Sequence, residues 1–209
     1  MINISEYKPL DKLVNILGKD FYKTEDHPYI IQRIQEGSCY EIYYALSNYY
    51  KPKKILEFGI ANGWSVTAMV LGYPEIEYIE GYDSEIAPVS LKNANKHIDN
   101  LKSKGYCKDT QFNFIRQDTW NIKKIEGHFD LVHIDGDWIY TSVKHDLQLA
   151  LSVNPKVILI DDTKCQEGTI NAMEEFIFHN KDKISNIYKL ENGGIKEEEK
   201  GLTVLEMKC

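Results

Sequence analysis

From Lys54 onward, short apolar segments alternate with segments of helical periodicity, and this alternation constrains the fold more than any other feature of the chain. The expected strands are 54–58, 76–82, 112–115, 129–134, 157–160, 184–190 and 202–207. The expected helices, with apolar residues on one face, are 65–71, 91–101, 143–150 and 170–177. Continuous apolar strands separated by helices are typical of a parallel sheet covered on both faces. We therefore predict an α/β fold with a doubly wound, mostly parallel, seven-stranded sheet.

The two ends of the chain depart from this alternation. The last two expected strands are joined by the polar connection 192–201, which predicts a closing hairpin and one antiparallel strand. Before the first strand, 11–18 has a short helical pattern, and Ser38 and Glu41 have capping-box spacing ahead of a second helix, on which Ile42, Leu46 and Tyr49 form the expected apolar face. We expect residues 1–50 to form an N-terminal helical cap on a core of residues 51–209, in a single domain.

Composition excludes several classes of protein. The 209 residues are 43% hydrophobic, enough for a folded core, and 25 Lys and Arg against 32 Asp and Glu give a net charge of −7. Nucleic-acid binding needs clustered basic residues, so it is not expected. No apolar run reaches the roughly 20 residues that span a bilayer, and the N-terminus lacks the apolar core of a signal peptide. Membrane binding is therefore not expected. Four scattered cysteines without zinc spacing favour a reduced, cytoplasmic protein.

The ends of the first two strands carry a candidate nucleoside site. Gly59 and Gly63 follow the first strand and precede a helix, whose N-terminal N–H groups suit a carboxylate or phosphate. Asp83 ends the second strand, where an acid can accept hydrogen bonds from a ribose diol. The fingerprint of NAD-binding proteins is absent, because Ala61 stands where the second glycine is expected and Glu57 precedes the turn.

Acidic residues follow the fourth and fifth strands. Asp135, Asp161 and Asp162 would meet at one edge of a parallel sheet, where their charges repel unless a cation shares them. Hard divalent cations such as Mg²⁺ bind through oxygen ligands, so a metal site is one interpretation. The alternative is that these acids cap helices or face water separately.

Four segments together resemble a known family: ILEFGIANGWS, GYDSE, FDLVHIDGD and ILIDDT, in this order. The chain is similar, over about 36–163, to class I S-adenosylmethionine-dependent methyltransferases. The most similar branch has an I-D-G-D-x-x-Y stretch and includes sugar and antibiotic O-methyltransferases; the likeness to catechol O-methyltransferases is more distant. The resemblance implies a Rossmann-like fold and S-adenosylmethionine as cofactor.

The resemblance also implies roles for individual residues. The cofactor-binding positions it implies are Glu57, Gly59, Gly63, Asp83, Asp118 and Asp135. The metal positions are Asp135, Asp161 and Asp162, for Mg²⁺ or another divalent cation. A bound metal would orient acceptor oxygens and lower their pKa.

One residue departs from the family pattern and concerns the proton-transfer step. Trp138 stands where many members of the branch have a histidine that is a candidate general base. The candidate catalytic residues are therefore Asp135, His133 and Lys164, although a lone histidine at a strand end is also commonly structural. Trp138 would suit a stacking surface for a sugar or aromatic acceptor.

The resemblance thus implies a methyltransferase that acts on a small hydroxylated acceptor, namely a sugar, natural product or phenol, with assistance from a metal. A nicotinamide-dependent oxidoreductase and a non-catalytic module of the same fold are the alternatives. The tyrosine-rich N-terminal segment could also supply a homodimer contact.

Overall fold

The computed structural model describes residues 40–84, 88–190 and 201–208. The predicted helix 11–18, the capping residue Ser38 and most of the polar connection 192–201 lie outside these ranges.

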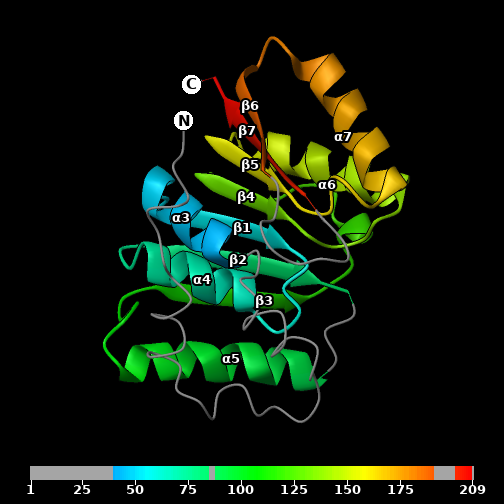
Figure 1. The fold of residues 1–209 in the computed structure, drawn as a ribbon. Helices are drawn as coiled ribbons and strands as arrows, with labels where there is room; N and C mark the ends of the chain where they lie inside the picture. The colour runs from blue at the N-terminus through cyan, green and yellow to red at the C-terminus, as the bar shows by residue number, and fades with distance from the viewer. Residues whose placement is uncertain (1–39, 85–87, 191–200, 209) are drawn as a thin grey trace.

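Seven strands form one sheet in the order β3-β2-β1-β4-β5-β7-β6 (Figure 1). The strands are β1 (Lys54–Phe58), β2 (Tyr78–Asp83), β3 (Gln111–Arg116), β4 (Leu131–Ile134), β5 (Val157–Ile160), β6 (Ile184–Leu190) and β7 (Leu202–Met207). The pairs among β1 to β5 are parallel, whereas β7 lies between β5 and β6 and is antiparallel to both. The predicted sheet, with its single antiparallel strand, is confirmed.

Helices cover both faces of this sheet, as a doubly wound fold requires (Figure 1). The helices are α3 (Tyr40–Tyr50), α4 (Trp64–Gly72), α5 (Pro88–Ser103), α6 (Tyr140–Ser152) and α7 (Glu167–Asn180), with the 3₁₀ turn η3 (Thr119–Asn121). Successive strand residues point to opposite faces. Ile55 accordingly packs in the core under α3, α4 and α5, whereas Leu56 packs in the core under α6 and α7.

The element boundaries and buried faces differ from the sequence expectations in detail. β2 and β4 each begin two residues later than expected, at Tyr78 and Leu131. On α3 the predicted apolar face included Tyr49, but that side chain is 50% exposed and Tyr43, at 1%, is buried instead. Tyr43 faces the sheet because α3 packs on α4 and against β4, a contact that periodicity along one helix does not determine.

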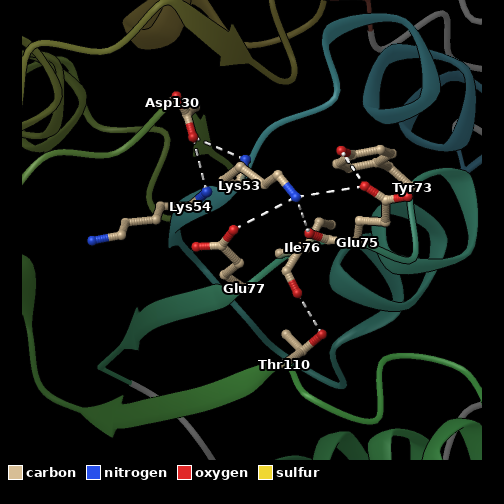
Figure 2. Close-up of polar contacts among 8 residues, drawn as sticks. All are labelled: Lys53, Lys54, Tyr73, Glu75, Ile76, Glu77, Thr110 and Asp130. Atoms are coloured by element: carbon tan, nitrogen blue, oxygen red, sulfur yellow. Dashed lines mark hydrogen bonds and ion pairs between the residues drawn. The ribbon is translucent and has the colours of Figure 1, made fainter.

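The amino ends of the strands are held by polar contacts (Figure 2). The carboxylate of Asp130 accepts hydrogen bonds from the backbone N–H groups of Lys53, at 2.8 Å, and Lys54, at 3.0 Å. The ammonium of Lys53 pairs with Glu75 and Glu77, each at 3.5 Å. These polar groups therefore hold neighbouring strands together at the amino ends of the sheet.

No helix among residues 40–84, 88–190 and 201–208 is long and apolar enough to cross a membrane.

Candidate active site

The turn between β1 and α4 is held tightly against the end of β4. Gly59 has a φ of 90°, and Gly63, which precedes α4, has a φ of 74°, in the region that favours glycine. A Cβ on Gly59 would lie 2.0 Å from the backbone oxygen of Asp135. A Cβ on Gly63 would lie 2.9 Å from the Cβ of Ala94 on α5. Both glycines are therefore required by close approaches within the protein, one of them to another candidate site residue.

The acid at the end of β2 is hydrogen-bonded to this turn. Asp83 is half-buried, and its Oδ2 accepts a hydrogen bond of 2.8 Å from the backbone N–H of Ala61. Ala61 itself has a positive φ of 43°, so the bond stabilises a backbone conformation that is otherwise unfavourable. The predicted juxtaposition of the glycine turn and Asp83 is present in the structure.

Asp118 follows β3 and is exposed. Its Oδ1 accepts a hydrogen bond of 2.9 Å from the backbone N–H of Trp120, so Asp118 caps the N-terminus of η3. Helix α6 holds this turn in place, because His145 Nε2 lies 3.0 Å from the backbone oxygens of both Thr119 and Ile122. The position of Asp118 thus depends on α6 as well as on β3.

Asp146, also on α6, was not singled out from the sequence. Asp146 is 2% exposed. Burial raises the pKa of its carboxyl group to about 6, although a hydrogen bond from Thr119 acts to lower it. Its Oδ1 has no hydrogen-bond partner among the described residues. The helical spacing of Val143, Asp146 and Leu147 could have predicted that Asp146 lies on the buried face of the helix.

Glu57 and His133 form a buried pair beneath the turn. They are register partners on β1 and β4, both are 0% exposed, and His133 Nδ1 lies 2.8 Å from Glu57 Oε1. The hydroxyl of Ser65, at the start of α4, donates to the same carboxylate oxygen, and the ring of Tyr43 packs on the imidazole with centroids 4.7 Å apart. Burial alone would lower the pKa of His133, but the carboxylates of Glu57, Asp135 and Asp161 outweigh burial and raise it.

His133 also belongs to a second group at the strand ends. One ring nitrogen of His133 and carboxylate oxygens of Asp135 and Asp161 all lie within 4.8 Å of one another. The predicted metal set contained Asp162 in place of His133. Asp162 is buried with a φ of 56° and lies outside this group, although Asp135 and Asp161 come together as predicted.

A hollow opens beside these acids. It is lined by Ile134, Asp135, Gly136, Asp137, Trp138, Val143, Asp161, Asp162 and Thr169. Asp137 is engaged in local structure, because its carboxylate accepts hydrogen bonds from the backbone N–H groups of Trp138 and Ile139 and from the Ser142 hydroxyl. Trp138, which lines this hollow, is 52% exposed as a residue.

Lys164, the remaining candidate base, lies on the segment after β5 and is exposed. Its stem runs along the chain at the start of β7, where a Cβ on Gly201 would lie 2.6 Å from its Cγ. Lys164 is not among the residues that line the hollow.

Comparisons with known proteins agree with this arrangement at the level of the fold. No protein-family model and no curated protein sequence matches the chain. Among solved structures, an O-methyltransferase from Bacillus cereus in complex with S-adenosylhomocysteine is similar, with a TM-score of 0.65, 14% identity, and 99% of this chain and 100% of the other covered. The O-methyltransferase TomG from Streptomyces achromogenes, in complex with S-adenosylmethionine, has a TM-score of 0.61 at 14% identity, with 100% of both chains covered.

A third similar structure is an S-adenosylhomocysteine-bound methyltransferase from Podospora anserina, with a TM-score of 0.60, 20% identity, and 93% of this chain and 88% of the other covered. All three matches extend over most of both chains and include the sheet that carries the site. The chain therefore has the fold of the S-adenosylmethionine-dependent O-methyltransferases.

Proposed function

We propose that this protein is an S-adenosylmethionine-dependent methyltransferase that methylates a hydroxyl group of a small acceptor, with assistance from a divalent metal. One observation carries the proposal: the glycine turn after β1 is fixed both to Asp83 at the end of β2 and to Asp135 at the end of β4. Ligands of open α/β sheets bind outside the carboxyl ends of the strands, and this is where the three elements meet.

The cofactor would be held by the turn and the acids around it. Gly59 and Gly63 keep the backbone of the turn close to neighbouring elements, and Glu57 supports the turn from below through Ser65. Asp83 would accept hydrogen bonds from the ribose hydroxyls, and Asp118 would contact the adenine from the η3 side. S-adenosylmethionine, when bound, supplies a methyl group activated by its sulfonium, so the protein has mainly to bind, orient and deprotonate the acceptor.

The acceptor would bind in the hollow beside Asp135, Asp161 and Asp162. Trp138 offers a partly exposed ring face there, which suits a sugar or a phenol. Asp135 is half-buried and lines the hollow, so among the three candidate bases it is the one we propose to take the acceptor proton, on a carboxylate oxygen that does not bind the metal. His133 is 0% exposed and would act through Asp135 or Asp161, whereas Lys164 would need to reach the hollow from outside.

Two measurements test the proposal. Calorimetry should detect binding of S-adenosylmethionine and S-adenosylhomocysteine. Formation of S-adenosylhomocysteine should then be measured across a panel of sugars and phenols, with and without Mg²⁺ or Mn²⁺. The proposal fails if the protein binds neither compound.

The same experiments separate the two alternatives. Binding of NADH but not of S-adenosylmethionine would favour an oxidoreductase. Binding of S-adenosylmethionine without turnover of any acceptor, in the presence of metal, would favour a non-catalytic module.

A further inference from the structure

We infer that His133, Asp135 and Asp161 form a mixed imidazole–carboxylate site for a first-row transition-metal dication, such as Mn²⁺ or Zn²⁺, rather than an all-carboxylate site for Mg²⁺. The inference rests on the proposed function for the use of the metal, but not for its binding. The site differs from the one expected from the sequence in one ligand, because His133 replaces Asp162.

The first observation is the placement of the three side chains. β4 lies between β1 and β5, and Asp161 continues the β4–β5 pairing, with its N–H 3.0 Å from the backbone oxygen of Ile134. His133 and Asp135 are two residues apart, so they point to the same side of β4. The three potential ligand atoms consequently lie within 4.8 Å of one another.

The second observation is the state of the imidazole. His133 is 0% exposed, its Nδ1 is occupied by Glu57, and its Nε2 has no hydrogen-bond partner among the described residues. A buried polar nitrogen without a partner is costly, and structures normally satisfy it with a protein group, a water or an ion. A metal ion between Nε2 and the two carboxylates would satisfy it.

The third observation is the contact on the far side of the ring. Metal-binding histidines usually donate their second ring N–H to a carboxylate, which fixes the tautomer and makes the ligand nitrogen more basic. Glu57 has this relation to His133, and the hydroxyl of Ser65 holds the Glu57 carboxylate in turn. Ring packing by Tyr43 further restricts the imidazole.

The ligand set then determines the kind of metal. Imidazole suits Zn²⁺, Fe²⁺ and Ni²⁺, and Mn²⁺, which prefers carboxylates, also accepts imidazole in a mixed set, whereas Mg²⁺ and Ca²⁺ are bound mainly through oxygen. Three protein ligands leave coordination positions open, as in metal sites that bind a water or a substrate.

The test uses Mn²⁺ as a spectroscopic probe on the full-length wild-type protein. Pulsed electron paramagnetic resonance should detect hyperfine coupling of bound Mn²⁺ to an imidazole nitrogen. This readout needs no methyl transfer and no variant, so it stands even if His133 variants do not fold. Mn²⁺ bound without nitrogen coupling would overturn the inference, as would a failure of both Mn²⁺ and Zn²⁺ to bind at about 1 mM, the weak end of protein sites for divalent cations.

Variants then identify the ligands by calorimetry with Zn²⁺ and Mn²⁺. Asp161→Asn and His133→Gln should each weaken binding by at least about 100-fold, and Glu57→Gln by about 10- to 100-fold. Asp162→Asn should leave the affinity for metal within about threefold of the wild type. His179 is an exposed histidine on α7, so His179→Gln is the matched control and should also leave the affinity unchanged. Loss of metal binding in Asp162→Asn, with affinity kept in His133→Gln, would instead establish the all-carboxylate set.

The two proposals fail separately. Mn²⁺ coupled to nitrogen in a protein that does not bind S-adenosylmethionine would leave this inference standing and overturn the proposed function. S-adenosylmethionine binding and turnover that depends on Mg²⁺, in a protein that binds neither Mn²⁺ nor Zn²⁺, would overturn this inference and leave the proposed function standing.

Discussion

Asp83 is the residue on which the nucleoside end of the proposed cofactor site depends. Asp83→Ala should weaken binding of S-adenosylhomocysteine by roughly 10- to 150-fold, because hydrogen bonds to a charged group contribute about 1.5–3 kcal/mol each. Asp83→Asn should lose less, since its amide oxygen can still accept the Ala61 N–H. Calorimetry measures both variants, with the exposed Asp109→Ala as control. Unchanged affinity in Asp83→Ala would contradict the ribose assignment.

The buried Asp146 should make the free energy of unfolding depend on pH. Its folded pKa, about 6, lies above the value of an unfolded aspartate, about 3.9, so the folded state binds more protons between these values. Its contribution therefore lowers the free energy of unfolding as the pH rises from about 4 to 6.

Asp146→Asn removes this penalty while keeping the shape of the side chain and an oxygen that can accept from Thr119. At pH 8 the variant should have a free energy of unfolding about 2 kcal/mol above that of the wild type, and the difference should vanish near pH 4. Urea unfolding at both pH values measures it. A variant less stable than the wild type at pH 8 would show that the charged carboxylate stabilises the fold.

At the scale of elements, the close approach of the turn between β1 and α4 to the end of β4 requires a glycine at position 59. Gly59→Ala would force a Cβ to within 2.0 Å of the Asp135 oxygen at a φ of 90°. We expect a loss of about 2–5 kcal/mol in the free energy of unfolding, from overpacking together with backbone strain. Gly127→Ala is the matched control, because its φ is 100° but nothing lies within 4 Å of its added Cβ. Denaturant unfolding should therefore show a much smaller loss for Gly127→Ala, and equal losses would mean that φ alone matters.

At the scale of the whole molecule, a ligand that binds only the folded state stabilises the entire cooperative unit. S-adenosylhomocysteine at 100 times its Kd should raise the free energy of unfolding by about 2.7 kcal/mol. For a chain of 209 residues this corresponds to a Tm increase of about 5–10 °C. Differential scanning calorimetry measures the shift, with NADH at the same concentration as the negative control. A shift with NADH alone would contradict the cofactor assignment.

The sequence by itself determined the elements and the edge of the sheet where the site lies. Strand β5 has the predicted bounds because a continuous apolar segment with polar flanks has few other ways to be buried, and both strands of the closing hairpin also have the predicted bounds. Gly59, Gly63 and Asp83 could be assigned to one candidate site because strand ends in a parallel sheet meet at one edge.

Only the tertiary structure decided which side chains meet at that edge. Asp162 immediately follows Asp161, yet a φ of 56° at Asp162 accompanies its exclusion from the group that contains His133. Periodicity places a residue on a face but does not report the backbone angle at the end of a strand. The buried environments of Asp146 and His133 likewise come from elements distant in the chain, since η3 packs on α6 and β1 pairs with β4. A linear pattern records residue types at each position, whereas the charge, burial and partners of a side chain depend on neighbours that only the folded chain brings together.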